Sequence, residues 1–281
     1  MTTDQITRIV LPGLVEPAGL EVVTEKAPTP GPGQLLVAVE ATGVSFAEQS
    51  MRKGRYFGQP AFPFTPGYDL VGTVLEVGTG GDERMLGRRV ASMTKTGAWT
   101  THAVVEARDT VPVPAGISAE DAETVVVNGV TAWQMLNRSA RVRSGGTVLL
   151  FGANGGVGGI LIQLARHQGV RVIGAASPRH HEALRAAGVE PVDYADPELE
   201  ARVRELAPGG VDAVFDNVGG EIARMSFRLL ARGGTLVTYA IVGVLDDAAS
   251  RGSAGLWGAF LKAIGQGLLW SALPNGKRAT F

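Results

Sequence analysis

The chain contains no cysteine among its 281 residues. This absence excludes disulfide bonds, a thiolate nucleophile and any zinc site that depends on cysteine ligands. An excess of charge of one sign is also missing, because 26 Lys and Arg residues face 27 Asp and Glu residues and leave a net charge of −1. Nucleic-acid binding usually requires a basic excess. No nucleic-acid partner is therefore expected.

A secretory signal pattern is also absent from the beginning of the sequence. The first ten residues, MTTDQITRIV, lack the charged-then-apolar order of a signal peptide, so a cytoplasmic location is the default expectation. Only residues 254–273, AGLWGAFLKAIGQGLLWSAL, approach the length of a membrane helix. Lys262 and Gln266 interrupt this stretch, and four glycines weaken it. We expect it to form a buried cap or a subunit contact, and we expect no membrane partner.

What the sequence does contain is enough apolar material for two domains, with 45% hydrophobic residues. The first part consists of short β-type runs separated by Pro/Gly turns, which predicts a compact barrel ending near residue 126. A helix from Ala119 to Leu136, with Ser118 as its N-cap, should follow the barrel. Strands are expected at 6–10, 20–24, 35–39, 70–77, 89–93, 98–105 and 110–113, with a short helix at 45–53.

The most informative stretch is Thr147–His181, which has the pattern of a strand, a glycine turn, a helix and a second strand. This pattern is typical of a parallel βαβ unit. The turn matches the dinucleotide fingerprint with Ala153 in place of its first glycine. Gly155 would let the backbone approach a pyrophosphate, Gly158 would let the helix pack close to the strand, and the helix N-terminus would bind the phosphate. The alternative is a glycine turn that serves packing only. The residues predicted to contact the phosphates are Asn154, Gly155, Gly156 and Val157.

The end of the second strand indicates which dinucleotide is bound. NAD-preferring sites place an acidic residue there to accept hydrogen bonds from the ribose 2′-OH. No acidic residue occurs between Ile160 and His181. Ser177 and Arg179 instead offer a hydroxyl and a permanent cation, which suit a 2′-phosphate. The cofactor expected is NADPH, although Arg179 could also be a solvated charge at the start of a helix.

Several motifs resemble those of one known family. The motifs are ATGVSF, RKGRY and PFTPGYDLVGTV within Ala41–Val74, NGVTAWQML at Asn128–Leu136, FGANGGVGGILIQLARHQG and ASPRHHEALRAAGV further on, VDAVFDNVGG at Val211–Gly220, and RGGTLVTYA at Arg232–Ala240. Through them, the chain resembles the medium-chain dehydrogenase/reductase superfamily, in its zinc-independent quinone oxidoreductase (zeta-crystallin-like) and enoyl reductase branch. The resemblance implies an α/β protein with a GroES-like β-barrel catalytic domain at 1–126 and a Rossmann, doubly wound parallel-sheet nucleotide domain at 127–281.

The resemblance also implies which residues would contact the cofactor. Thr131 would lie at the nicotinamide end, and Asn217 would border the cofactor. Tyr194 would pack by the adenosine phosphate, together with the serine and arginine described above. The loop that contains Ala240 and Ile241 would lie beside the nicotinamide, although its sequence departs from the commoner phenylalanine-glycine version.

In the barrel, the resemblance implies a site without metal. Ser45 and Tyr68 stand where zinc-dependent relatives have cysteine and histidine ligands. Tyr56 matches a tyrosine that enoyl reductase relatives place near the substrate. Tyr56 is therefore the first candidate for a proton donor, and Ser45 is a candidate hydrogen-bond partner for the acceptor carbonyl. The alternative is that Tyr56 only forms an aromatic wall, and Tyr68 and Asp69 look structural by comparison.

These features together predict an NADPH-dependent reductase that delivers hydride to a quinone or an α,β-unsaturated carbonyl compound. Two alternatives remain: an enoyl-thioester reductase or biosynthetic tailoring enzyme, and a non-enzymatic, crystallin-like NADPH-binding protein. A homodimer formed through an edge strand is expected by resemblance. Family members normally continue beyond a sixth strand, expected at 277–281, so we expect either a truncated chain or a shortened homologue.

Overall fold

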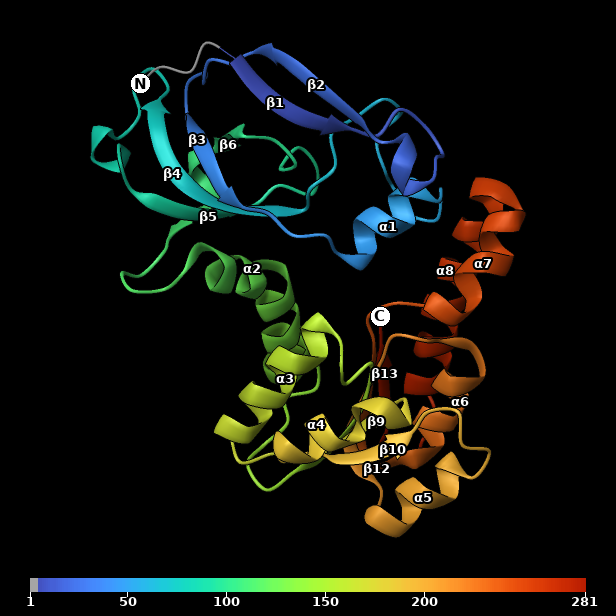
Figure 1. The fold of residues 1–281 in the computed structure, drawn as a ribbon. Coiled ribbons are helices and arrows are strands. Elements are labelled where there is room, and N and C mark those ends of the chain that lie inside the picture. Colours follow the sequence, from blue (N-terminus) through green and yellow to red (C-terminus); the bar gives the residue numbers. More distant parts are fainter. Residues whose placement is uncertain (1–4) are drawn as a thin grey trace. The chain divides into compact units, whose positions relative to one another are not determined.

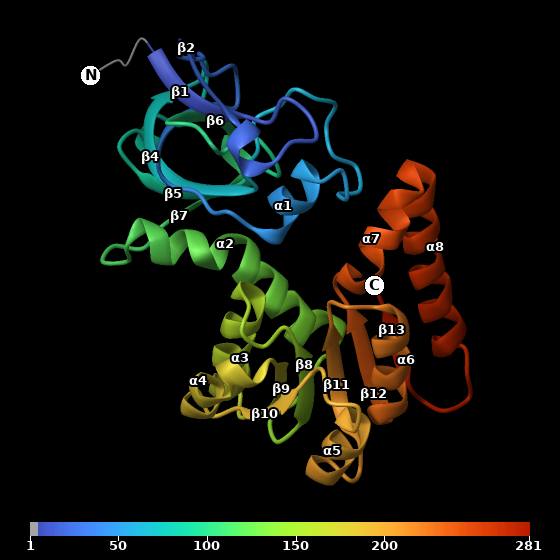
Figure 2. The ribbon, with the colours of Figure 1, turned by 45° about the vertical axis from the view of Figure 1, so that its right-hand side comes forward.

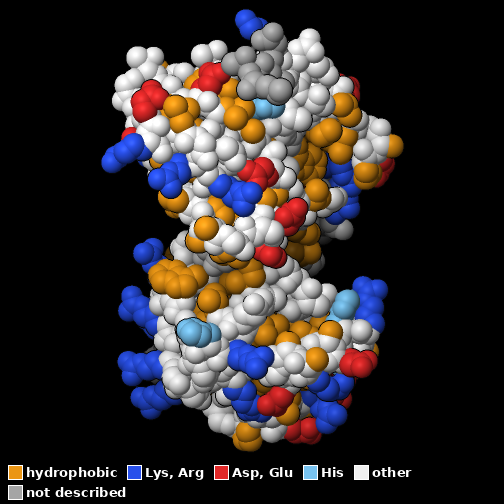
Figure 3. All heavy atoms as spheres, turned by 60° about the vertical axis from the view of Figure 1, so that its left-hand side comes forward, with side chains coloured by type: hydrophobic (Ala, Val, Ile, Leu, Met, Phe, Trp, Pro, Cys, Tyr) orange, Lys and Arg blue, Asp and Glu red, His pale blue; other side chains and the backbone are white. Residues whose placement is uncertain are grey.

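The computed structural model describes residues 5–281, apart from the side chains at positions 246, 247, 249 and 253. The chain forms two compact units, of which one ends at Val127 and the other spans Asn128–Phe281 (Figure 1). The sequence alone had suggested a division at residue 126. On the face drawn in Figure 3, basic and acidic side chains both lie on the surface, as a net charge of −1 leads one to expect.

The first unit is an antiparallel β structure. Strands β1 (Gln5–Val10) and β2 (Glu21–Lys26) form a two-stranded ribbon. A five-stranded sheet has the order β6-β3-β4-β5-β7, with every neighbouring pair antiparallel. Its strands are β3 (Gln34–Ala41), β4 (Asp69–Val77), β5 (Arg89–Met93), β6 (His102–Glu106) and β7 (Thr110–Pro112).

Two predicted elements of this region differ from the structure. The strand expected at 98–105 begins only at His102, because Trp99 and Thr101 make backbone hydrogen bonds with β1. The helix expected from Ala119 to Leu136 is α-helical only to Trp133 (α2, Ala119–Trp133) and continues as a π-helical turn, Gln134–Ser139. Ser118 caps this helix as predicted, since its Oγ accepts a hydrogen bond of 3.0 Å from the Asp121 N–H.

The second unit is a six-stranded parallel sheet of order β10-β9-β8-β11-β12-β13. This is the strand order of a doubly wound dinucleotide fold, and the predicted fold class is therefore confirmed. The strands are β8 (Thr147–Phe151), β9 (Arg171–Ala176), β10 (Glu190–Asp193), β11 (Val211–Asp216), β12 (Leu230–Thr238) and β13 (Arg278–Thr280). The helices are α3 (Gly156–His167), α4 (His181–Ala186), α5 (Leu199–Leu206), α6 (Gly220–Leu229), α7 (Val242–Ser250) and α8 (Gly252–Ser271).

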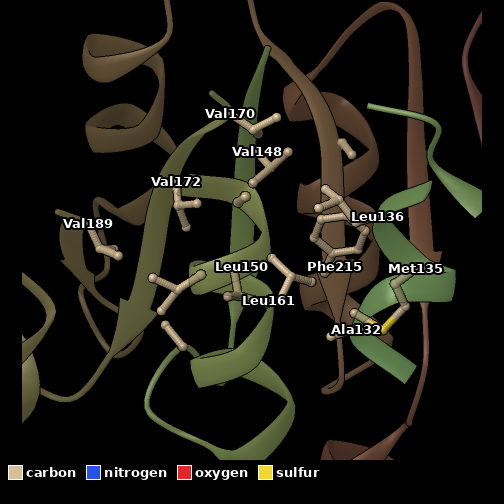
Figure 4. Packing of buried hydrophobic residues seen from close by; sticks show 14 of the residues in the cluster. Ala132, Met135, Leu136, Val148, Leu150, Leu161, Val170, Val172, Val189 and Phe215 are labelled. Atoms are coloured by element: carbon tan, nitrogen blue, oxygen red, sulfur yellow. The ribbon is translucent and has the colours of Figure 1, made fainter. Parts of the chain in front are cut away.

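The central strand β8 contributes to two separate hydrophobic cores. Its side chains alternate between the two faces of the sheet, as they do in any strand. Val148 and Leu150 pack with Leu161 of α3 on one face, as Figure 4 shows. Leu149 and Phe151 lie in the other core, which includes residues of α5 and α6. A run that is apolar at every position thus marks a strand buried on both faces.

The C-terminal helix α8, predicted to be a buried cap or a subunit contact, is only partly buried within this unit. Its residue Leu256 is 6% exposed and packs with α7 in a small hydrophobic cluster. Leu261 and Leu268, in contrast, are 61% and 69% exposed. None of the helices in the described part of the chain combines the length and hydropathy of a membrane span.

Two adjacent glycines at the start of α3 give a test of how this unit is packed. A Cβ at Gly158 would lie 2.3 Å from the Gly152 carbonyl oxygen, whereas a Cβ at Gly159 would meet nothing within 4 Å. We expect Gly158→Ala to lower the free energy of unfolding by about 1–3 kcal/mol or more through overpacking. Gly159→Ala should be neutral or stabilising by up to about 1 kcal/mol, because alanine favours the helix. Urea unfolding of the two variants checks this, and equal effects would contradict the close approach.

Candidate nucleotide-binding and catalytic sites

The glycine turn after β8 has the geometry of a phosphate-binding turn. Gly152 has a φ of +69°, a conformation that favours glycine and lets the chain reverse directly after the strand. Gly155 is the N-cap of α3, and no side chain caps this helix. The first N–H groups of α3 therefore have no acceptor within the helix and can donate to an anion. Asn154, Gly155 and Gly156 are exposed and Val157 is half-buried, so the turn is open to a ligand.

Two asparagine side chains lie against this turn. A Cβ at Gly152 would lie 2.8 Å from Asn217 Nδ2, and a Cβ at Gly156 would lie 2.9 Å from Asn128 Nδ2. Asn217 Oδ1 is buried and has no hydrogen-bond partner among the described residues. A buried acceptor of this kind needs a donor. The unpaired amide oxygen of Asn217 fits a nucleotide cofactor at this edge of the sheet. So does the glycine backbone of the turn, where an added side chain would occupy the space for the ligand.

The next strands bring three predicted cofactor residues to the same edge. β9 and β10 are paired so that Ala176 lies opposite Asp193, which places Ser177 and Tyr194 one position further on. Tyr194 is 55% exposed. Arg179 is exposed, and its Nε donates to His180 Nε2 at 3.0 Å. In the described part of the chain no carboxylate forms an ion pair with Arg179, so its charge is available to an anion.

The residues predicted to lie at the nicotinamide end differ in how exposed they are. Thr131 is half-buried and lies one turn beyond Asn128 on α2, so both face the same side of that helix. Ala240 is half-buried beyond β12. Ile241 is only 2% exposed, because its side chain packs in the cluster with α7 and α8. Only the backbone of Ile241 could therefore face a ligand at the sheet edge, and its predicted contact stays a prediction.

In the first unit, Tyr56 and Tyr68 form a pair. Their hydroxyl oxygens are 2.8 Å apart, and their rings meet edge to face with centroids 6.3 Å apart. Burial, followed by the hydrogen bond with Tyr68, raises the pKa of Tyr56 above its ordinary value. Tyr56 therefore keeps its proton at neutral pH. From the sequence, Tyr68 looked structural. Its hydrogen bond with the Tyr56 hydroxyl became visible only in the fold.

Ser45 has a local structural partner. Its Oγ accepts a hydrogen bond of 3.0 Å from the Ala47 N–H and donates to Glu48 Oε2, which makes Ser45 the N-cap of α1 (Phe46–Arg52) in a capping box. The Glu48 side chain is buried and also accepts from the Tyr68 N–H at 2.8 Å. The proposed hydrogen bond from Ser45 to a substrate would compete with this cap, and it stays a prediction.

Asp69, which is buried, and Glu123, which is half-buried, form a pair of carboxyl groups. Asp69, 6% exposed, accepts a hydrogen bond of 3.2 Å from the Val127 N–H of α2. Burial raises the pKa of Asp69, and the hydrogen bond with the Glu123 carboxyl raises it further. The pair therefore retains a proton at a pH where exposed carboxyls are ionised. Asp69 and Glu123 tie the start of α2 to β4.

Comparisons with known proteins identify this arrangement. Residues 31–115 match the family model described as "Alcohol dehydrogenase GroES-like domain", and residues 156–256 match "Zinc-binding dehydrogenase". A mycobacterial protein solved as a complex with NADPH is 35% identical, with 84% of this chain and 73% of that chain covered and a TM-score of 0.76. The chain belongs to the medium-chain dehydrogenase/reductase superfamily. The predicted family is thereby confirmed.

Other relatives place this superfamily member in the quinone oxidoreductase, VAT-1 and enoyl reductase branch. A quinone oxidoreductase of Pseudomonas syringae is 26% identical, with 98% of this chain and 80% of that chain covered and a TM-score of 0.81. The human "Synaptic vesicle membrane protein VAT-1 homolog" is 36% identical over 220 residues. That alignment covers 78% of this chain and 56% of the relative, so the chain spans little more than half the length of the curated relatives it matches.

The name of the second family model mentions zinc, and the residues of this chain do not match a zinc site. The chain has no cysteine, and Ser45 and Tyr68 occupy the positions of the expected ligands. In the part of the chain that the structure describes, no three His, Cys, Asp or Glu side chains lie close enough together to hold a metal ion. This superfamily member thus differs from zinc-dependent dehydrogenases in its residues.

The Asp69 pair gives a prediction for stability against pH. A carboxyl whose pKa is raised by folding lowers stability as the pH rises above the ordinary carboxyl pKa of about 4. We expect Asp69→Asn to increase the free energy of unfolding, and by more at pH 9 than at pH 5, because the amide accepts from Val127 and donates to Glu123 without a charge. Urea unfolding at both values of pH measures this effect. Glu21→Gln, at an exposed position, should show no such difference, and an equal response of both variants would refute the coupling.

Proposed function

We propose that the protein is an NADPH-dependent, zinc-independent reductase of quinones or α,β-unsaturated carbonyl compounds. The observation that carries the proposal is the open phosphate turn, beside which Arg179 stands where an NAD-preferring site has an acid. The mycobacterial relative solved with NADPH and the Pseudomonas syringae quinone oxidoreductase support both the cofactor and the acceptor class.

The cofactor's binding would involve residues at the carboxyl edge of the parallel sheet. The α3 N–H groups and Gly155 would hold the pyrophosphate, and Ser177 and Arg179 would hold the 2′-phosphate. Asn217 Oδ1 would gain the donor that it lacks. When bound, NADPH would supply a hydride, which is a proton with two electrons, to the electron-poor carbon of the unsaturated carbonyl compound or to the quinone oxygen.

The acceptor then needs one proton to complete a two-electron reduction. Tyr56 is the proposed donor, because its phenol is protonated at neutral pH and forms a hydrogen bond with the Tyr68 hydroxyl. The Tyr68 hydroxyl, 2.8 Å away, would donate a hydrogen bond to the Tyr56 oxygen as charge develops there. The bond that forms is C–H or O–H at the acceptor, and the bond that breaks is the Tyr56 O–H.

An enoyl-thioester acceptor is a second candidate within the same chemistry. A segment of the "Phthioceranic/hydroxyphthioceranic acid synthase" of Mycobacterium tuberculosis is 36% identical over 211 residues, which cover 74% of this chain and 10% of the synthase. A panel of a quinone, an enone and an enoyl thioester, run with NADPH and NADH, separates these acceptors. Tight NADPH binding without oxidation by any of them would favour a non-enzymatic binding protein.

The assignment of Arg179 leads to a test of cofactor preference. A hydrogen bond to a charged group contributes about 1.5–3 kcal/mol, so we expect Arg179→Ala to raise the KM for NADPH by roughly 10-fold or more. The KM for NADH should stay unchanged, because NADH lacks the 2′-phosphate. Steady-state kinetics with both cofactors measure this difference. Arg185→Ala, which removes an exposed cation from α4, is the control, and equal losses in both variants would exclude a specific contact.

The tyrosine pair leads to a test of the proton donor. We expect Tyr56→Phe to lower kcat by roughly 10²–10⁴-fold, the usual contribution of a general acid. Tyr68→Phe should lower kcat less and shift its pH profile, because it removes only the hydrogen bond to Tyr56. Turnover measured between pH 5 and pH 10 on the best acceptor of the panel checks both. Full turnover of Tyr56→Phe would show that Tyr56 donates no proton.

A further inference from the structure

Helix α8 exposes several of its large apolar residues to solvent. An ordinary surface helix turns its large apolar residues toward the core. On α8, Leu261, Ile264 and Leu268 are instead 61%, 42% and 69% exposed. Leu256 and Trp270 do pack against the rest of the second unit. Between them, the residues of α8 that line the adjoining space include several small ones: Gly258, Ala259, Ala263 and Gly267. These small residues cannot fill the space between α8 and the sheet.

That space is a cavity of about 580 Å³ within the second unit. α6, α7, α8 and the ends of β12 and β13 line it, and Figure 2 shows α8 running past α6 and β13. Its volume lies within the range of about 300–1,000 Å³ that is usual for small-molecule sites. Leu236 and Trp270 add apolar surface to the small residues of α8. The cavity can therefore take an apolar chain.

The same cavity has a polar side. Thr238 lines it and is 8% exposed, and its hydroxyl has no hydrogen bond to any described residue. Three cations, Arg224, Arg251 and Lys262, also line the cavity, and its described lining contains no Asp or Glu side chain. Arg224 is already paired with Glu221. Lys262 has no ion pair with a described residue, and its long side chain can place the ammonium group at the cavity rim.

We propose that this cavity binds an amphipathic anion with one long apolar chain and a single anionic head. The chain would lie along the small residues of α8, from Gly258 to Gly267. The head would accept hydrogen bonds from Lys262 Nζ and from the Thr238 hydroxyl, which has no hydrogen bond to a described residue. The cavity lining also includes Ile241, whose loop is predicted to lie beside the nicotinamide. The tests below therefore measure binding of the probe and not turnover, so their failure is distinguishable from failure of the proposed reductase function.

Calorimetric titration tests the chemical class of the ligand. The probes are dodecanoate, dodecyl phosphate, dodecan-1-ol and butanoate, each below its micelle concentration. We expect saturable binding of at least one of the two long anions at one site. The two anions differ only in the head, so their ranking tells a carboxylate from a phosphate source. Dodecan-1-ol and butanoate should bind at least 10-fold more weakly. No saturable binding of either long anion, or equal binding of the alcohol, would overturn the proposal.

Matched variants on α8 test the location. Gly258 lines the cavity, and its added Cβ meets nothing within 4 Å, so Gly258→Leu should fill the space and weaken binding at least 10-fold. Gly265 has equally open surroundings but does not line the cavity, so Gly265→Leu should bind like the parent protein. Equal affinity of the Gly258→Leu and parent proteins would overturn the location.

The charge is tested by a variant that leaves the packing intact. We expect Lys262→Gln to weaken binding of the long anion by roughly 5–10-fold and to reduce its dependence on salt, because one cation is lost from the site. Arg166→Gln removes an exposed cation from α3 and should change neither quantity. Binding by Lys262→Gln at the parent affinity and with the parent salt dependence would exclude Lys262 as the head-group partner.

Discussion

The close approach of α3 to β8 is the constraint on which the second unit depends. A Cβ at Gly158 would lie 2.3 Å from the Gly152 oxygen, so only glycine lets the helix begin directly above the strand. This approach aims the free N–H groups of α3 at the sheet edge and brings Leu161 into one of the two cores. The phosphate turn and the packing of the unit thus have the same structural cause.

The chemistry of the first unit depends on buried carboxyls. Glu48 accepts from the N–H of Tyr68 and so fixes the backbone of the residue that contacts Tyr56. Asp69, at the start of β4, accepts from the Val127 N–H on α2 and pairs with Glu123. Burial raises the pKa of Asp69, whereas Glu48 accepts hydrogen bonds from the N–H groups of Ser45 and Tyr68. A zinc site with cysteine ligands cannot form around these carboxyls, because the chain contains no cysteine.

Helix α8 gives this family member a feature that its fold does not require. The parallel sheet and the phosphate turn are built from β8–β12 and α3, whereas α8 lies beside β13 and encloses a cavity lined by small residues. An outward face with Leu261 and Leu268 suits contact with another surface. The predicted homodimer stays a prediction, as does the proposed anion site.

The sequence by itself determined the family, the fold class and the position of the phosphate turn, because strand periodicity and glycine spacing are local properties of the chain. It also placed Ser177 at the end of the second strand of the βαβ unit, whereas Tyr194 was implied only by the resemblance to the family. Only the tertiary structure decided which polar groups meet: Asn128 and Asn217 at the turn, Tyr68 with Tyr56, and Asp69 with Glu123. These partners come from different elements, and their contacts depend on packing that no local pattern encodes. For the same reason, the apolar composition of α8 did not predict which of its residues line the cavity.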